Sequence, residues 1–145
     1  MEIIRADNSG FCFGVKKALE TTQEQIKESK ASSSKGSLFT CGPLIHNKIV
    51  TSQLENDGVR IIKTPDEAKE GDTIIVRSHG EPKAFYDRMD KLNLNYVDTT
   101  CPFVSKIHTI VNGACKEGKK IIIIGDANHQ EVIATNGWCD NSAYI

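Results

Sequence analysis

An internal repeat runs through this chain, and each copy carries a cysteine. The pattern C-x-x-V-x-K occurs at residues 12–17 and again at residues 101–106. A second pattern, G-x-x-x-H-[NQ], follows each copy, at residues 42–47 and 125–130. Because repeated units tend to pack together around an axis, equivalent residues of the two copies can converge on one point. Thiols and imidazoles would surround that point.

Short apolar runs alternate with amphipathic segments along the chain. This alternation predicts an α/β fold with a mostly parallel sheet and right-handed crossovers, in repeated three-layer units. The run at residues 119–124 contains four consecutive isoleucines and is typical of a fully buried strand. Predicted strands occupy residues 2–6, 38–41, 59–62, 73–76, 96–98 and 119–124, and predicted helices begin near residues 15, 47, 65, 85, 104 and 131.

The repeat divides the chain into two expected units. The first covers residues 1–95, and the second covers residues 96–145. The first copy continues past its histidine through two more predicted strands, whereas the second stops soon after its last predicted helix. We therefore expect an incomplete second unit and a chain that is part of something longer.

Composition narrows the classes of partner and compartment. The 145 residues can bury a core, and a net charge of −1 gives no reason to expect nucleic acid or a membrane surface as partner. No apolar run reaches the length of a membrane span, and the N-terminus does not resemble a secretory signal. We therefore expect a cytoplasmic protein with reduced thiols.

Five cysteines without any C-x-x-C pair argue against a zinc ribbon or a thioredoxin-like site. Metal binding, catalysis or simple burial remain for these thiols. Cys12 and Cys101, the two cysteines of the repeat, could be thiolate ligands of iron or zinc, or small buried hydrophobic residues. Packing is expected for Cys41, Cys115 and Cys139.

Five side chains suited to chemistry share a position just beyond the carboxyl end of a predicted strand. Open parallel sheets bind ligands at that edge, so we expect these residues to lie on one rim of the fold. They are Cys12, His46, His79, Cys101 and His129.

The three histidines of that set each stand beside a loop or a helix start. An imidazole there can join backbone N–H groups in holding an anion such as a phosphate or a diphosphate. Glu131 follows His129 at a spacing that suits a proton donor in a semi-enclosed site, although a solvated residue in the first turn of a helix is the alternative. His108 lies on a helical apolar stripe and is expected in the core.

Several signatures of other chemistries are missing from the sequence. There is no G-x-x-x-x-G-K-[ST] loop and no G-x-G-x-x-G after a predicted strand. H-x-E opens the signature of zinc deaminases, but the P-C-x-x-C that should follow it is also missing. The residues alone thus indicate a metal-dependent α/β enzyme that acts on a phosphorylated compound.

Five motifs together resemble the LytB-type iron–sulfur reductases that act on 4-hydroxy-3-methylbut-2-enyl diphosphate. The motifs occur in the order of that family and cover most of the chain. They are GFCFGV at residues 10–15, IHN at 45–47, SHG at 78–80, TCPFV at 100–104 and HQEV at 129–132.

The resemblance implies a fold of three α/β units around a pseudo-threefold axis, two of them present here. Each unit of such an enzyme supplies one cysteine to a 4Fe–4S cluster, so Cys12 and Cys101 would be two of three ligands, with the third beyond Ile145. The resemblance also implies that His46, His79 and His129 bind the substrate diphosphate and that Glu131 donates a proton.

The activity that the resemblance implies is reductive dehydroxylation to isopentenyl and dimethylallyl diphosphate. This is the last step of the non-mevalonate isoprenoid route, with ferredoxin or flavodoxin as electron donor. The chain departs from the family at Gln130, where proline is usual, and at Ala134, where glycine is usual. With two cluster cysteines, the chain alone is expected to be inactive. A zinc-dependent hydrolase of deaminase type and a non-catalytic phosphate-binding domain remain as alternatives.

Overall fold

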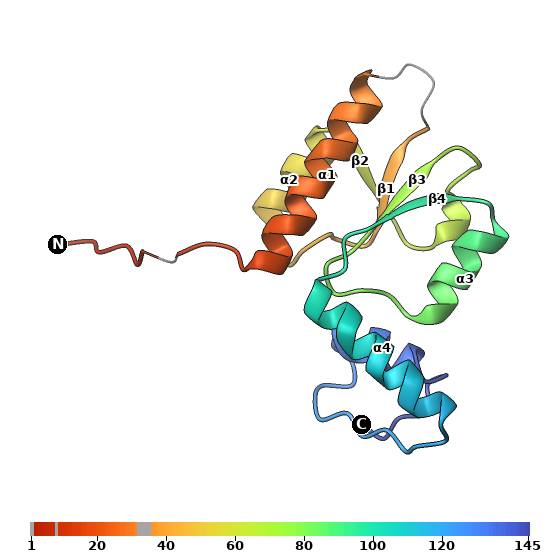
Figure 1. The fold of residues 1–145 in the computed structure, drawn as a ribbon. Helices are drawn as coiled ribbons and strands as arrows, with labels where there is room; N and C mark the ends of the chain where they lie inside the picture. The colour runs from red at the N-terminus through yellow and green to blue at the C-terminus, as the bar shows by residue number, and fades with distance from the viewer. Residues whose placement is uncertain (1, 8, 32–35) are drawn as a thin grey trace.

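The fold is known from a computed structural model, which describes residues 2–7, 9–31 and 36–145 (Figure 1). Helices and strands alternate over most of this part of the chain. In order, the elements are α1 (Phe13–Ala31), β1 (Leu38–Cys41), α2 (Lys48–Asn56), β2 (Val59–Ile62), the 3₁₀ turn η1 (Pro65–Glu67), β3 (Thr73–Val76), α3 (Lys83–Lys91), β4 (Asn95–Asp98), α4 (Pro102–Lys116) and α5 (Gln130–Gly137).

The four strands form one parallel sheet in the order β2-β1-β3-β4. Helices α1 and α2 lie on one face of this sheet, and α3 lies on the other (Figure 1). The prediction of a three-layer α/β unit with a parallel sheet is therefore confirmed for the first part of the chain. The predicted boundary between units, after residue 95, falls inside β4, which pairs with β3.

Alternating side chains of the strands supply the two halves of the core. In β3, Ile75 faces the cluster that includes Ile26 of α1 and Leu54 of α2. Its neighbour Ile74 faces the opposite cluster, which includes Met89 of α3. Successive side chains of a strand point to opposite faces, so a sheet covered by helices on both faces needs apolar residues at every position.

Two predicted strands are wrong. Residues 2–6, all of which the structure describes, form no strand, and they extend away from the sheet with Ile3 82% exposed (Figure 1). Residues 119–124 contribute only a single bridge, between Ile122 and Tyr144, and Ile124 is 98% exposed. A strand must find partners for its backbone hydrogen bonds, and neither segment has a neighbouring strand in the described part of the chain.

The second part of the chain is held mainly by α4 and α5, which pack against each other beyond the end of the sheet (Figure 1). Val104, His108 and Val111 form the buried face of α4. Burial of His108 confirms the prediction for that residue. None of the described helices is both long and apolar enough to span a bilayer.

Candidate functional site

The site forms where the strand order reverses. From β1 the chain crosses to β2 on one side, and from β3 it crosses to β4 on the other, so the loops after β1 and β3 flank a gap at the carboxyl edge of the sheet. Ligands bind at such switch points in open α/β sheets. His46 comes from the first loop and His79 from the second, and their ring centroids lie 4.5 Å apart. The prediction of a shared rim is therefore confirmed for His46 and His79.

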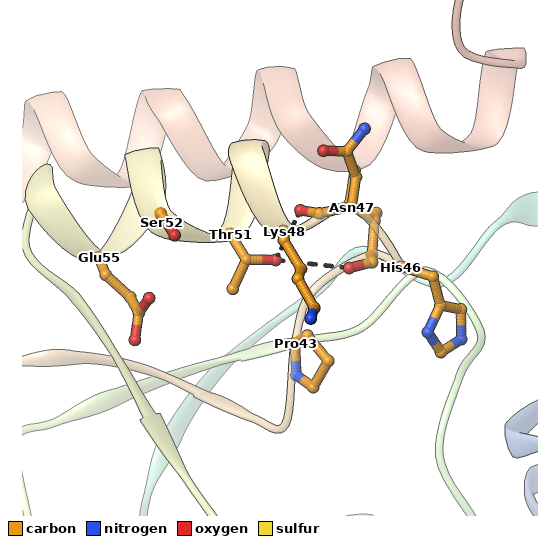
Figure 2. Close-up of a pocket in the computed structure, with 8 residues that line it drawn as sticks. Pro43, His46, Asn47, Lys48, Thr51, Ser52 and Glu55 are labelled. Atoms are coloured by element: carbon orange, nitrogen blue, oxygen red, sulfur yellow. Dashed lines mark hydrogen bonds between the residues drawn. The ribbon is translucent and has the colours of Figure 1, made fainter.

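The start of α2 fixes the loop that carries His46. The side chain of Asn47 caps this helix, accepting hydrogen bonds from the backbone N–H of Ile49 (3.1 Å) and of Val50 (3.3 Å). Asparagine is a favoured residue at this position because its oxygen replaces a missing helical acceptor. A cavity of about 450 Å³ runs from His46 along α2 to Glu55 (Figure 2).

His79 lies deeper than His46 in the same site. Burial lowers its pKa to about 4, and the nearby charges of His46, Arg77 and His129 add to this effect. Its Nδ1 atom is buried and has no hydrogen-bond partner. His79 is therefore neutral at pH 7, and one of its ring nitrogens has an unmet hydrogen-bonding capacity.

A small cavity of about 240 Å³ joins the histidine pair to the first cysteine loop. Phe11 and Val15, on either side of Cys12, line this cavity together with both histidines. Ser78 lines it too, and its hydroxyl donates to the carbonyl of Leu44 at 3.4 Å. A ligand in this cavity would thus contact the histidines next to the start of α1.

The two cysteines of the repeat occupy the same local position. The carbonyl of Cys12 accepts the first helical hydrogen bond of α1, and that of Cys101 accepts the equivalent bond of α4. Each thiol therefore stands at a helix N-terminus, where the peptide dipoles favour negatively charged groups. Cys12 is exposed and Cys101 is half-buried.

Close backbone contact brings these two helix starts together. A Cβ atom placed on Gly14 would lie 2.6 Å from the Sγ atom of Cys101. The thiol of Cys101 thus rests against the first turn of α1, two residues after Cys12. The backbone N–H of Cys101 also donates to the carbonyl of Ser78 at 3.0 Å, which ties this cysteine to the loop that carries His79.

Cysteine side chains at two adjacent helix starts are suitable donors for iron or another soft metal. Among the described residues, no three His, Cys, Asp or Glu side chains are grouped as a metal site. Cys12 and Cys101 therefore fit part of the ligand set of a metal cluster.

The other three cysteines behave as expected from the sequence. Cys41 and Cys139 are buried, and Cys115 is partly buried on α4. Burial, with a smaller contribution from the charge of Glu81, raises the pKa of Cys41 to about 12. Cys41 is thus a neutral thiol in the core.

His129 and Glu131 lie at the start of α5. His129 is the N-cap, and its Nδ1 atom accepts a hydrogen bond from the backbone N–H of Glu131 at 3.3 Å. The effect of His129 on the pKa of His79 places it within electrostatic reach of the histidine pair. Both His129 and Glu131 are exposed, so the semi-enclosed environment expected for Glu131 is not present in this chain.

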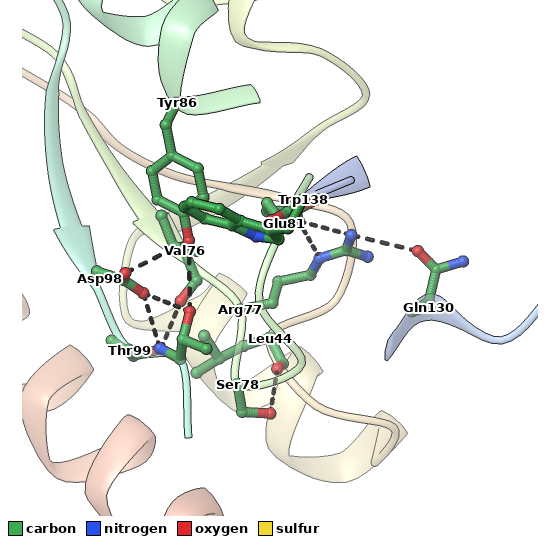
Figure 3. A network of polar contacts seen from close by, with 11 residues as sticks. Leu44, Val76, Arg77, Ser78, Glu81, Tyr86, Asp98, Thr99, Gln130 and Trp138 are labelled. Carbon is green, nitrogen blue, oxygen red and sulfur yellow. Dashed lines mark hydrogen bonds and ion pairs between the residues drawn. The ribbon is translucent and has the colours of Figure 1, made fainter. Parts of the chain in front are cut away.

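A polar network beside the histidines was missed by sequence reasoning (Figure 3). Arg77 and Glu81 form an ion pair whose side chains are 13% and 8% exposed, and Arg77 also contacts Gln130 of α5. The i,i+4 spacing of opposite charges was visible in the sequence. It suggests a surface helical pair, and only the turn after β3 places it in the interior.

Parallel α/β proteins with a polar site at a switch point form a broad class of enzymes and binding proteins. In this chain, the helix starts that carry Cys12 and Cys101 add two thiols near that site. A family profile described as LytB protein matches residues 3–145. The chain belongs to this LytB family.

The relatives carry the name of one enzyme. The 4-hydroxy-3-methylbut-2-enyl diphosphate reductase of Alkaliphilus oremlandii is 48% identical over the whole chain and 50% of its own length. That of Clostridioides difficile is 42% identical over 100% of the chain and 50% of its length. The chain spans about half the length of these curated relatives.

Two solved structures share the fold. One is a structure of (E)-4-hydroxy-3-methyl-but-2-enyl diphosphate reductase, described as the terminal enzyme of the non-mevalonate pathway. It has 39% identity and a TM-score of 0.78 over 98% of this chain and 49% of its own. The other is the reductase from Plasmodium falciparum, with 33% identity and a TM-score of 0.86 over 96% of this chain and 42% of its own.

Proposed function

We propose that this chain is the part of a 4-hydroxy-3-methylbut-2-enyl diphosphate reductase that supplies two cluster cysteines and the diphosphate-binding histidines. The contact between Gly14 and Cys101 carries this proposal, because it packs the second repeated cysteine against the helical turn that follows the first. The division into units at residues 1–95 and 96–145 is part of the proposal, with one cysteine in each unit.

The reaction removes a hydroxyl group from an allylic diphosphate. Two electrons and two protons are consumed: the C–O bond breaks, the oxygen leaves as water with one proton, and the other proton adds to carbon. The products are isopentenyl and dimethylallyl diphosphate. A bound 4Fe–4S cluster would supply the electrons and Lewis-acid assistance to the departure of the hydroxyl group.

Each candidate residue has a role in this scheme. Cys12 and Cys101 would be two of the cysteine ligands of the cluster. His46, His79 and His129 bind the diphosphate, and the cavity that His46 and His79 line together supports this assignment. Glu131 supplies a proton from the start of α5. Because Glu131 is exposed in this chain, this role requires another segment of protein over Glu131 to exclude water from the reacting carbon.

Two further assignments complete the proposal. Ferredoxin or flavodoxin delivers the electrons one at a time, as the resemblance implies. The protein works in the cytoplasm, which agrees with its five free cysteines and with the rule that thiols stay reduced there.

A chimera tests the proposal. Residues 1–145 replace the matching half of the Alkaliphilus oremlandii reductase, and the chimera is reconstituted with iron and sulfide without oxygen. We expect bound iron, acid-labile sulfide and reductase turnover, all lost in Cys12→Ser and in Cys101→Ser. Cys115→Ser is the matched control on α4 and should leave all three unchanged.

Other results point to the alternative functions. Stoichiometric zinc without sulfide would support a zinc-dependent hydrolase. Retained function and ligand affinity in Cys12→Ser would support a non-catalytic phosphate-binding domain. The 145-residue chain alone is expected to show little or no turnover, because its described residues provide two thiols and no group of three metal-binding side chains.

A further inference from the structure

A buried ion pair connects the loop after β3 to the helix that carries Glu131. The Nε and Nη2 atoms of Arg77 both donate to Oε1 of Glu81, each at 2.6 Å. A buried carboxylate is costly to desolvate unless it is paired, and burial raises the pKa of Glu81 even though Arg77 opposes this shift. Neither side chain has a role in the function proposed above.

The same loop holds α5 at both ends (Figure 3). At the first residue of the helix, Oε1 of Gln130 accepts a hydrogen bond from Nη2 of Arg77 at 3.3 Å. At its end, the indole N–H of Trp138 donates to the carbonyl of Glu81 at 3.0 Å. The two charged residues therefore contact α5 at points one helix length apart.

Close packing supports the contact at the end of α5. A Cβ atom on Gly137 would lie 2.4 Å from Cβ of Pro82, so the helix backbone touches the residue that follows Glu81. By contrast, the first turn of α5 is exposed at both His129 and Glu131. Apolar packing does not hold these two side chains. Besides the cap that His129 forms with the backbone N–H of Glu131, a hydrogen bond from Arg77 to Gln130 ties this turn to the loop after β3.

We propose that Arg77 and Glu81 are positioning residues that set, through Gln130 and Trp138, where α5 presents His129 and Glu131 to the histidine cavity. The functional importance of those two side chains rests on the proposed function, whereas the contacts themselves do not. An arginine suits this position because its planar guanidinium can donate to Glu81 and Gln130 at once. A lysine ammonium keeps the charge but lacks this fixed fork.

The first test uses the 145-residue chain and variants of Gln130 and Arg77. Gln130→Ala removes the contact to α5 and leaves the ion pair intact, and Arg77→Lys removes the fork. Both should raise hydrogen exchange of the amides of residues 133–135, the first that bond within the helix, about fivefold, the effect of one lost hydrogen bond. Both should also shift the imidazole NMR signals of His129, while the melting temperature of Gln130→Ala stays near that of the unmodified chain.

Two further variants make this test specific. Gln130→Glu keeps an oxygen that can accept from Arg77 and should restore slow exchange. Asp87→Asn removes the exposed ion pair of Lys83 and Asp87, which has the same i,i+4 spacing, and it should change neither signal. Unchanged exchange and unchanged His129 signals in both Gln130→Ala and Arg77→Lys would overturn the inference.

A titration with inorganic diphosphate, followed by the NMR signals of His79, separates the inference from the proposed function. Binding that weakens severalfold in Gln130→Ala supports positioning, and equal affinities overturn it. If the unmodified chain binds no diphosphate, the proposed diphosphate site fails. The exchange and His129 measurements then still decide whether Arg77 and Glu81 position α5.

Discussion

Two isoleucine-rich segments of this protein differ in burial. Ile74 and Ile75 of β3 are fully buried between two helical layers. The run at residues 119–124 has a similar composition, yet Ile122 and Ile124 are exposed. The two runs differ in the strands beside them. Strand β3 pairs with β1 and β4, whereas residues 119–124 form only a single bridge, between Ile122 and Tyr144. Whether a segment forms a strand thus depends on the strands that can pair with it as much as on its own residues.

The largest expected difference in stability is between two variants that place a charge in one or the other segment. Ile75→Asp buries an unpaired carboxylate in the central sheet and should cost more than about 4 kcal/mol of the free energy of unfolding. Ile124→Asp should change it by less than about 0.5 kcal/mol, since that side chain is 98% exposed. Urea unfolding followed by circular dichroism measures both. A large loss in Ile124→Asp would show that residues 119–124 are buried in solution.

A second prediction compares two glycines on α1 and α4. Gly14→Ala pushes a methyl group into Sγ of Cys101 and should cost about 1–3 kcal/mol of stability by overpacking. Gly113→Ala meets no atom within 4 Å and should add about 0.5–1 kcal/mol through helix propensity. Thermal unfolding measures both variants, and we expect a lower melting temperature for Gly14→Ala and a higher one for Gly113→Ala. Equal effects of the two substitutions would mean that the starts of α1 and α4 are not in contact.

A third and smaller effect concerns the pH dependence of stability. The pKa of His79 falls from 6.5 to about 4 on folding, so the unfolded chain takes up this proton first as the pH drops. Stability contributed by the neutral ring is therefore complete above pH 6.5 and is lost progressively down to about pH 4. The full shift would correspond to a loss of about 3 kcal/mol over this window. Because His79 is only half-buried and solvent screens its charge, we expect a loss on the order of 1–2 kcal/mol.

The control for this prediction is His79→Gln, which cannot titrate. Urea unfolding at pH 7 and at pH 5 should show a smaller difference in this variant than in the unmodified chain. An identical difference would assign the pH dependence to other groups. Because the charge of His129, in the second part of the chain, contributes to the lowered pKa of His79, the same measurement on His129→Gln shows how far the two parts are coupled.

Local sequence was enough to predict the first unit and part of the site. The strands from Leu38 to Asp98 are separated by helices with clear apolar periodicity, and each of them is paired in the structure. His46 and His79 follow two of these strands, so their meeting at the sheet edge could be expected. The sequence also put Cys12 at this edge, but the reason was wrong, because the strand expected before Cys12 does not form. The starting turn of α1 brings it there instead.

The sequence by itself determined where helices and strands can begin, and it placed each repeated cysteine directly before a helix. Those choices depend on residues within a few positions of one another, such as the Asn47 cap of α2. Tertiary structure alone decided which isoleucines are buried, which cysteine rests against Gly14, and that Arg77 joins Glu81 to α5 in the interior. These contacts join residues distant in sequence, and their energies depend on desolvation and pairing that no local pattern contains.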